Sequence, residues 1–503
     1  MMSAWEHLAV GILLPPFFGA LIAALFPHRH RHGAWAAAVV STGLAFLASI
    51  GGLVYVVKEG AVSYHLGGWA PPMGIELVMD PLSAFFCAVV TGMAFFVFLH
   101  GKSVVERETP DKTIPFYSAA LLLLGGLAGI LLTGDLFNLY VFLEISSLAG
   151  YALVAVGDKK APVAAFRYLI LGTIGASFYL LGVAFLFMET GSLNMRDVAE
   201  VIPVMGESPA TLAGLVLIVF GIGLKMALFP MHGWLSDAYT YATSTATALI
   251  APIGTKVAAY VLIRTCFFMF DPDYVRDQIP LTLIIGYLGA AGIIWGSLMA
   301  IAQSDFKRML AFSSVSQIGY IALGVGLASP LGLIGAVLHT LNHAVMKACL
   351  FLVTTNVLTK FGHCRITKFD RSYRIRMPWT MAAFTVAALS MIGLPPTAGF
   401  FSKWYLVLGS WEQANYVFLG VILISSLLNV VYFFRVLEKV YLRGDGEAYD
   451  EASEREDAAV VREEVRGSML FPTVFLAAGL LALGLFNAFI VVHFIRPMIP
   501  GGL

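Results

Sequence analysis

The chain has 503 residues, of which 59% are hydrophobic and 12% are charged, and its formal net charge at pH 7 is zero. The charged fraction is about half of that in soluble domains, and the mean hydropathy is +0.84. The neutral balance gives no basic surface for nucleic acid, and the lack of short alternating strands excludes a membrane β-barrel. Long apolar runs recur throughout, so we expect an all-α polytopic membrane protein.

The N-terminal part, residues 1–110, is expected to hold three transmembrane helices and an external hairpin. Apolar runs cover roughly 8–26, 34–57 and 80–99. Between the last two, the segment 59–79 alternates around Gly-Gly and Pro-Pro pairs, which is typical of a small hairpin outside the bilayer. The N-terminus lacks a basic region and a small-residue cleavage site, so we interpret it as a retained helix rather than a signal peptide.

Further apolar runs bring the total to about fourteen expected transmembrane helices. They cover roughly 115–133, 136–156, 163–188, 211–231, 242–269, 280–302, 309–328, 331–358, 378–408, 414–437 and 469–496. Two of these runs share a proline break, a lysine and a following aromatic residue: GLKMALFPMHGW (223–234) and GLPPTAGFFSKWYL (393–406). They lie five spans apart, and a repeat with an odd number of helices inserts in the opposite orientation. We therefore expect two inverted five-helix repeats with broken helices, at 115–270 and 280–440.

An acidic loop at 441–468 separates the second repeat from a C-terminal transmembrane helix at 469–503. Its segment 444–467 carries nine acidic residues, which fits a solvated linker or a partner-docking segment. Lys and Arg concentrate in the short loops after odd-numbered spans, at 28–32, 101–112, 157–160, 305–308 and 360–376. The positive-inside rule places these loops in the cytoplasm of a prokaryotic cell, and both termini on the outer side of its inner membrane.

Metal, cofactor and soluble-type catalytic sites have no support in the sequence. The four cysteines, Cys87, Cys266, Cys349 and Cys364, are scattered without CxxC or CxxCH spacing, so no zinc, iron–sulfur or haem site is expected. GxSxG, HExxH and Walker motifs are also missing. We therefore expect no cofactor and no catalytic centre within this chain.

Two charged residues lie deep inside the fifth and seventh expected spans. Lys225 lies about fourteen residues into the run at 211–231, where a lysine is costly and where its stem is too short to reach an interface. Glu144, about nine residues into the run at 136–156, is its expected partner, because a nearby ammonium favours the charged carboxylate. The alternatives are a snorkelling lysine and a glutamate that acts only as a neutral hydrogen-bonding group.

The eighth and eleventh spans carry further buried cations and histidines. Lys256 follows Pro252 and Gly254, which loosen the helix and can free backbone groups that hold water. His339, His343 and Lys347 are spaced i, i+4 and i+8 and therefore share one helical face. That stripe fits a proton wire. The alternatives are a lysine that reaches an interface, and core histidines whose hydrogen bonds are satisfied within the fold.

The twelfth span adds Lys403, which follows GLPPTAGFFS and takes the position that repeat symmetry assigns to Lys225. His232 and Asp237 lie near the broken seventh span as possible accessory groups, for which structural roles remain open and, for Asp237, favoured. The charges occur about once per central helix. This pattern suits a lateral, hydrated proton path at mid-membrane depth.

Six stretches together carry a resemblance to a known family over essentially the whole chain. They are FLEISSLAGYALVA (142–155), RYLILGTIGASFYLLG (167–182), FPMHGWLSDAY (229–239), SDFKRMLAFSSVSQIGY (304–320), HTLNHAVMKACLFL (339–352) and GLPPTAGFFSKWYL (393–406). The chain resembles the proton-translocating antiporter-like family, which includes subunits of respiratory complex I and of membrane-bound hydrogenases. It resembles more closely the D subunit of the multi-subunit Mrp Na⁺/H⁺ antiporters.

The resemblance implies roles for individual residues. In that family a fifth-span glutamate and a seventh-span lysine form a functional pair, which matches Glu144 and Lys225. The eighth-span lysine matches Lys256, and the eleventh-span histidines match His339 and His343. The family's usual proline is missing at 236–246, which leaves the start of the eighth span open.

The function implied is that of an ion-translocating subunit of a larger membrane complex. It would move H⁺, coupled to Na⁺ or K⁺ antiport, with other membrane subunits and the lipid bilayer as its partners. An alternative is the proton-pumping subunit of a complex I-like oxidoreductase or hydrogenase. A quinone-binding or electron-transferring subunit is a rival that the missing cofactor motifs disfavour. A purely structural scaffold leaves the buried charges unexplained.

Overall fold

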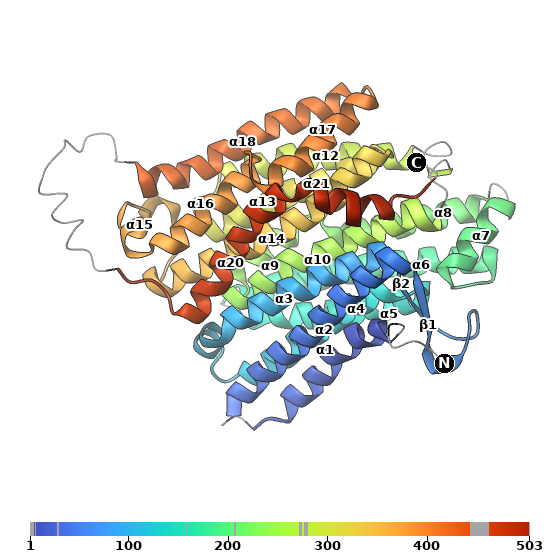
Figure 1. The fold of residues 1–503 in the computed structure, drawn as a ribbon, viewed down its shortest axis with the longest axis horizontal. Helices are drawn as coiled ribbons and strands as arrows, with labels where there is room; N and C mark the ends of the chain where they lie inside the picture. The colour runs from blue at the N-terminus through green and yellow to red at the C-terminus, as the bar shows by residue number, and fades with distance from the viewer. Residues whose placement is uncertain are drawn as a thin grey trace, which may run out of the picture.

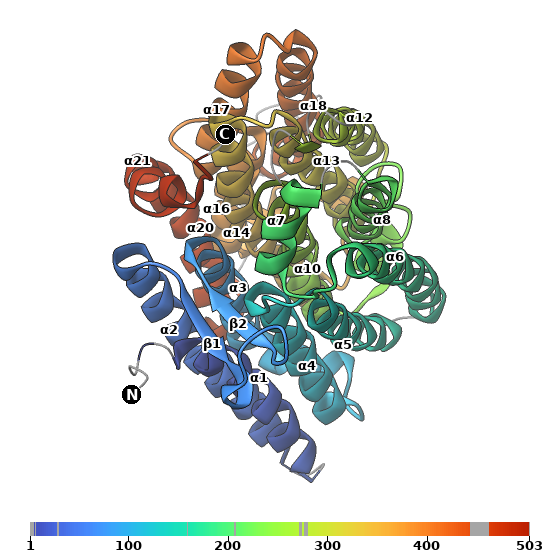
Figure 2. The ribbon, with the colours of Figure 1, turned by 90° about the vertical axis from the view of Figure 1, so that its right-hand side faces the viewer.

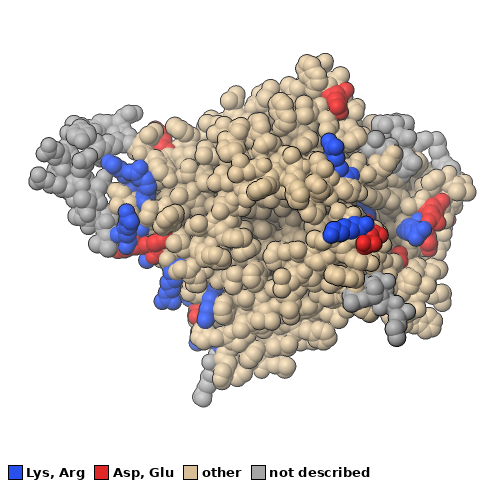
Figure 3. All heavy atoms as spheres, viewed as in Figure 1, with Lys and Arg blue, Asp and Glu red and all other residues tan. Residues whose placement is uncertain are grey.

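The computed structural model describes residues 5, 7–27, 30–157, 159–205, 208–270, 274–275, 280–442 and 462–501. Within them, 13 helices are long and apolar enough to cross a membrane, and the broken pair α16–α17 supplies the remaining expected crossing. Charged side chains gather toward the two ends of the long axis, with a largely uncharged band between them on the face shown in Figure 3. The predicted all-α, multi-pass fold is therefore confirmed (Figure 1).

The helices follow the predicted order along the chain. The N-terminal three are α1 (Leu8–Leu25), α2 (Arg31–Glu59) and α3 (Pro81–Glu108). The next group is α4 (Thr113–Leu132), α5 (Leu136–Ala155), α6 (Ala161–Thr190), α8 (Pro209–Met226), α9 (Leu235–Tyr241) and α10 (Ser244–Arg264). The third group is α12 (Leu281–Ile301), α13 (Phe306–Gly326), α14 (Pro330–Phe361), α16 (Pro378–Ile392), α17 (Ala398–Glu412) and α18 (Tyr416–Tyr441). The last long helix is α20 (Gly467–Leu485), followed by the short α21 (Asn487–Ile490).

The predicted hairpin forms between α2 and α3. Strands β1 (Val62–His65) and β2 (Glu76–Met79) pair antiparallel, with Val62 opposite Met79. The hairpin and both described chain ends lie at one end of the molecule (Figure 1). The residues on either side of 443–461 lie at the other end, as the expected topology requires. The part of the acidic loop within 443–461 lies outside the described residues.

Two short helices were not anticipated from the sequence: α7 (Met195–Met205) and α15 (Ser372–Arg376). Both follow the third helix of a repeat, α6 or α14, and both lie at an end of the molecule (Figure 1). The start of the eighth span, which the sequence left open, is Ser244. There Thr243 accepts the Ala246 N–H as an N-cap, and Glu108 accepts the Ser244 N–H at 2.7 Å.

The internal repeat is visible in its hydrogen bonding. Asp135 caps the start of α5 and forms an isolated antiparallel bridge with Asn194, beyond α6. Asp305 caps the start of α13 and forms the same bridge with Arg365, beyond α14. The first bridge lies beside α7 and the second beside α15, at opposite ends of the molecule (Figure 1). Equivalent contacts at opposite ends are what two inverted repeats produce.

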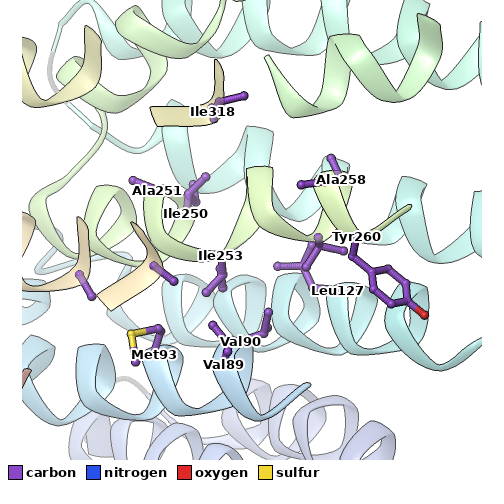
Figure 4. Close-up of a cluster of buried hydrophobic side chains, with 14 of the residues drawn as sticks. Val89, Val90, Met93, Leu127, Ile250, Ala251, Ile253, Ala258, Tyr260 and Ile318 are labelled. Atoms are coloured by element: carbon purple, nitrogen blue, oxygen red, sulfur yellow. The ribbon is translucent and has the colours of Figure 1, made fainter. Parts of the chain in front are cut away.

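Helices α10 and α14 run through the centre of the bundle (Figure 2), and α10, α13 and α14 are almost completely buried. Figure 4 shows part of the surrounding core, in which Ile253 of α10 faces Val90 of α3 and Leu127 of α4. Large apolar side chains thus surround the two central helices. A polar side chain in the middle of either helix is cut off from solvent, so it must find a partner inside the protein.

Candidate functional site

Lys225 lies in the last turn of α8, beside the break that separates α8 from α9. Its Nζ donates to Ser147 Oγ at 2.8 Å and to Tyr151 Oη at 3.3 Å, both on α5. The break begins at Ala227, which adopts the left-handed conformation at φ 61°. Trp234, beyond the break, donates its indole N–H to Leu224 O at 2.9 Å. The broken helix therefore holds the lysine at mid-span and points it at α5.

Glu144 lies on the same helix as the two hydroxyl groups that receive Lys225. Ser147 and Tyr151 follow it at i+3 and i+7, so the three side chains share one face of α5. The lysine ammonium takes the hydroxyls rather than the carboxylate. One carboxylate oxygen of Glu144, Oε1, is buried and has no hydrogen-bond partner among the described residues. The expected partners are thus neighbours, and the structure shows them apart rather than in contact.

A small internal cavity of about 50 Å³ connects Lys225 to the eighth span. Its polar lining includes Ser147, Tyr239 and Thr255, the residue before Lys256. A polar cavity needs roughly 10–15 Å³ to hold one water molecule, so this one has room for more than one. Hydration here would join the seventh-span lysine to the eighth-span lysine.

Lys256 lies on α10 and is fully buried. Its Nζ donates to Ala251 O at 2.8 Å, one turn back on its own helix, and lies 3.4 Å from Thr255 Oγ1. The helix continues through Pro252 without a break. The ammonium of Lys256 therefore bonds the carbonyl of the residue before Pro252, in the segment where the sequence predicts free backbone groups.

The stripe on α14 faces α13 and α17. Lys347 Nζ donates to Leu310 O at 2.7 Å and to Ser313 Oγ at 2.6 Å, both on α13. The rings of His339 and His343 are 6.0 Å apart and nearly parallel. All three side chains are fully buried. Both ring nitrogens of His343 and Nε2 of His339 have no partner among the described residues, so they are free to bind water or a proton.

The stripe continues to the second broken helix. His339 Nδ1 lies 3.0 Å from Ser402 Oγ, the residue before Lys403 on α17. Lys403 Nζ reaches back across the break and donates to Met391 O at 3.0 Å and Ile392 O at 2.9 Å, at the end of α16. It also lies 4.9 Å above the ring of Tyr320. The ammonium of Lys403 thus lies at the break, although the residue itself belongs to α17.

One detail differs from the symmetry expectation. Lys225 precedes its break and belongs to the first half-helix, whereas Lys403 follows its break and belongs to the second. Both ammonium groups still lie at the end of a first half-helix, because the long stem of Lys403 runs back past Gly393. That glycine has φ 92°, and a Cβ on it would lie 3.0 Å from Lys403 Cδ.

The two accessory candidates take different positions. Asp237 forms an ion pair with Arg167 at 2.7 Å and lies 3.8 Å from Arg308, so it ties α9 to α6 and α13. The ring of His232 stacks on Phe229 at 5.5 Å, and its Nδ1 has no partner among the described residues. Asp237 is therefore a cross-link between helices, and His232 lies in the break after α8 with one ring nitrogen, Nδ1, left without a partner among the described residues.

Sequence reasoning missed the uncharged members of the site. Ser147, Tyr151, Ser313 and Ser402 each contact a lysine or histidine of the row. Only the i+3 and i+7 spacing of Ser147 and Tyr151 from Glu144 could have indicated them. Hydroxyl side chains recur in most spans, and many of them bond a carbonyl of their own helix.

Sequence comparison with known proteins shows the family to which the chain belongs. Residues 133–429 match the transmembrane family described as NADH:quinone oxidoreductase/Mrp antiporter. The N subunit of NADH-quinone oxidoreductase from Desulforudis audaxviator is 45% identical over 98% of this chain and 99% of its own length. The D subunit of the Na⁺/H⁺ antiporter from Alkalihalophilus pseudofirmus is 30% identical over 95% of this chain and 94% of its own length.

Solved structures of membrane complexes contain similar chains. One belongs to the membrane-bound sulfane sulfur reductase, an archaeal respiratory complex, with a TM-score of 0.87 and 28% identity, covering 97% of this chain and 96% of that one. Another belongs to the Mrp complex of Dietzia, with a TM-score of 0.85, covering 99% of this chain and 97% of that one at 24% identity. The predicted resemblance to the antiporter-like family is confirmed, although the oxidoreductase N subunit, at 45% identity, is more similar to this chain than the antiporter D subunit, at 30%. The chain belongs to the NADH:quinone oxidoreductase/Mrp antiporter family and is an antiporter-like, multi-pass subunit of the type found in ion-translocating membrane complexes.

Proposed function

We propose that this subunit moves protons along the buried row from Glu144 and Lys225 through Lys256 to the α14 stripe and Lys403, in exchange for Na⁺ or K⁺. The single observation that carries the proposal is the succession of these lysines on packed helices: α10, which carries Lys256, packs against α14, and α14 packs against α17, which carries Lys403. Each of its lysines has hydroxyl or carbonyl partners, and a cavity with room for water separates the first from the second. A structural scaffold would have no use for such costly groups at mid-membrane depth.

The separation of Glu144 from Lys225 supplies the driving step. Two unit charges about 4 Å apart attract by about 4 kcal/mol at an effective dielectric constant of about 20. When the carboxylate swings onto the ammonium, that attraction holds the proton on Lys225. When the lysine turns to Ser147 and Tyr151, as in this structure, the attraction weakens and the proton can leave through the cavity toward Lys256.

We place the proton inlet at the end of the molecule that carries the cationic loops. A cavity of about 480 Å³ there is lined by Glu108, Ser244, Asp305 and Lys307. It opens beside the start of α10, the helix that carries Lys256. If the cationic loops are cytoplasmic, this cavity is the cytoplasmic mouth of the path. Cysteine labelling that finds Lys360 and the C-terminus on the same side of the membrane would contradict this orientation.

The test of the function uses the assembled complex in vesicles, with cation uptake driven by a pH gradient. Lys347→Ala should abolish uptake, because it removes the titratable group between α13 and α14. Lys360→Ala is the matched control, since Lys360 lies on the same helix but is exposed near its end. Assembly is checked by co-purification of the other subunits. Equal uptake in both variants would refute the proposal.

A second candidate function is supported by the 45% identical relative named as a subunit of NADH-quinone oxidoreductase. The same row of residues would then pump protons on energy delivered by a redox module elsewhere in the complex, without cation exchange. The two functions differ in one observable. Proton movement that follows an electron donor and ignores Na⁺ and K⁺ would favour the pump, and movement that a Na⁺ or K⁺ gradient drives alone would favour the antiporter.

A further inference from the structure

Helix α16 is held by a charged side chain at each end. At its C-terminal end, Lys403 Nζ donates to the carbonyls of Met391 and Ile392. At its N-terminal end, Glu464 Oε2 accepts the N–H groups of Trp379 at 3.0 Å and Thr380 at 3.3 Å. A helix leaves N–H groups unpaired at its start and carbonyls unpaired at its end, and its dipole favours an anion at the first and a cation at the second.

Glu464 does not belong to either repeat. It lies in the described tail of the acidic loop, directly before α20, and it is 84 residues along the chain from Thr380 in the helix that it caps. Its Oε1 also accepts the Thr380 hydroxyl at 2.6 Å. The neighbouring Glu463 makes a separate, exposed contact: its N–H donates to Arg376 O at 2.9 Å, and its carboxylate pairs with the Arg376 guanidinium. The tail of the acidic loop is thus fixed to the start of α16.

The cap continues into the core through a row of fully buried polar groups. Asn356 of α14 donates to Thr380 Oγ1 at 3.4 Å and to Thr473 Oγ1 of α20 at 3.2 Å. Its Oδ1 lies 2.8 Å from Nε2 of His100 on α3. An amide is a poor proton carrier, so this row is a clamp between helices rather than a branch of the proton path. It keeps the N-terminal end of α16 in place against three other helices.

We propose that Glu464 is a positioning residue for Lys403. The inference rests on the proposed function, in which Lys403 is the last titratable group of the row. Because α16 is a single uninterrupted helix from Pro378 to Ile392, a shift at its capped start is transmitted to the carbonyls at its end. Those carbonyls are the closest partners of the Lys403 ammonium. The acidic loop would thereby set the environment of the terminal lysine from outside the repeat.

The other contacts of that ammonium are too weak to fix it alone. Ser426 Oγ lies at 3.5 Å and the Tyr320 ring at 4.9 Å. Met391 O is shared with Asn429 Nδ2 at 3.1 Å. Among the described residues, titratable groups around this position are Tyr320 of α13, His339 of α14, whose ring contacts Tyr320 at 5.2 Å, and Tyr432 of α18, which donates to Asn429 Oδ1 at 2.9 Å. None of them can replace the two carbonyls of α16.

The experiment compares Glu464→Ala and Glu464→Gln with the control Glu463→Gln in the assembled complex. The control removes one carboxylate charge from the same loop tail, and the hydrogen bond and charge of Arg376 lower the pKa of Glu463, so that carboxylate is ionised at neutral pH. Hydrogen exchange of a peptide that covers the first turn of α16 reports the cap, independently of transport. The pH profile of proton movement reports the position of Lys403.

We expect Glu464→Ala to accelerate exchange in the first turn of α16 and to displace the midpoint of the pH profile. The acceleration of exchange should be about fivefold, the order expected for loss of one helix cap. Glu464→Gln, which keeps an acceptor, should show a smaller displacement, and Glu463→Gln should match the wild type.

Three results would overturn the proposal. Unchanged exchange in Glu464→Ala would show that no cap was lost. Faster exchange with an unchanged pH midpoint would show that α16 does not position Lys403, while leaving the proposed function intact. An equal displacement in Glu463→Gln would assign the effect to loop charge. If the wild-type complex moves no protons, the proposed function fails, and the exchange measurement still decides whether Glu464 caps α16.

Discussion

Each of the two broken helices holds a lysine ammonium at the end of its first half, but the two lysines start from opposite sides of the break. Lys225 ends the first half of its helix and turns outward to the hydroxyls of Ser147 and Tyr151 on a neighbouring helix. Lys403 starts from the second half and turns back to the carbonyls of Met391 and Ile392 on its own broken helix. The hydrogen-bond partners of the Lys225 ammonium therefore come from another helix, and those of the Lys403 ammonium are the carbonyls left free by the break in its own helix.

The different hydrogen-bond partners indicate different roles for Lys225 and Lys403 in proton transfer. A hydroxyl can accept a hydrogen bond from an ammonium and can also donate one to a neutral amine, whereas a carbonyl can only accept. The site of Lys225 can therefore serve both protonation states, and the partly buried carboxylate of Glu144 lies on the same face of α5. The site of Lys403 favours the cation, through carbonyls at a helix C-terminus. We interpret Lys225 as the switching lysine and Lys403 as the terminal acceptor.

The largest expected effect comes from removing the switch. Glu144→Ala and Lys225→Ala should each abolish proton movement while the complex still assembles, because either change leaves the other group without its charged partner. The double variant should be no worse than either single one, which is strong non-additivity for residues that act as a unit. Cation uptake in vesicles measures all three. Near wild-type rates in both single variants would disprove the coupling of Glu144 and Lys225.

The lysines of the two broken helices can be predicted from the sequence, but their hydrogen-bond partners cannot. Lys225, Lys256 and Lys403 stand out because a charge within an apolar run is rare and costly, and prolines mark both breaks. The fold class, the hairpin and the existence of a repeat follow from the same patterns of hydropathy and punctuation. These features depend on local composition, which the sequence displays directly.

The position of the charged group at the tip of a flexible side chain could not be predicted from the sequence. A lysine stem is long and flexible, so its position in the sequence does not show which side of a break its ammonium reaches. The same freedom separates Glu144 from Lys225 in the structure, although they lie on neighbouring helices. The cap from Glu464 is also beyond the reach of the sequence, because it joins residues 84 positions apart and depends on how α20 packs.

The next largest effect tests the terminal lysine. Lys403→Arg keeps the positive charge and can still donate to the carbonyls at the end of α16, but guanidinium is effectively always protonated. We therefore expect normal assembly and almost complete loss of proton movement. Arg435→Lys is a useful control, since Arg435 donates to the carbonyls of Ile301 and Gln303 at the end of α12 and lies off the proposed path. Full activity of Lys403→Arg would show that Lys403 is only a fixed charge.

A smaller effect is expected from the glycine that lets Lys403 turn back. Gly393 has φ 92°, and an added Cβ would lie 3.0 Å from Lys403 Cδ and 3.4 Å from its Nζ. A left-handed conformation costs a non-glycine residue about 1–2 kcal/mol, so Gly393→Ala should lower both the thermal stability of the complex and the transport rate. Gly420→Ala on α18, where a Cβ would meet open space, should lower neither. Equal stability of the two variants would mean that the end of α16 can rearrange freely.

The smallest effect concerns the hydroxyl that distinguishes the site of Lys225. Tyr151→Phe removes one long hydrogen bond of 3.3 Å but keeps the ring, which packs edge-on against Tyr168 at 4.6 Å. A typical hydrogen bond contributes about 1 kcal/mol net, and this one is longer than usual. We therefore expect the rate of proton movement to fall only about twofold to threefold, with assembly unchanged.

The control for that change is Tyr140→Phe, on the same helix, whose ring lies against Phe137 at 6.0 Å. It should leave the rate unaltered. Ser147→Ala removes the shorter bond of 2.8 Å, so it should slow transport more than Tyr151→Phe does. If hydroxyls serve the neutral amine as well as the ammonium, both variants should slow proton release from Lys225 more than proton uptake by it, which single-turnover measurements after a pH jump can separate. Equal slowing of both steps would mean that the hydroxyls only anchor the charged lysine, and the contrast with Lys403 would then be one of geometry alone.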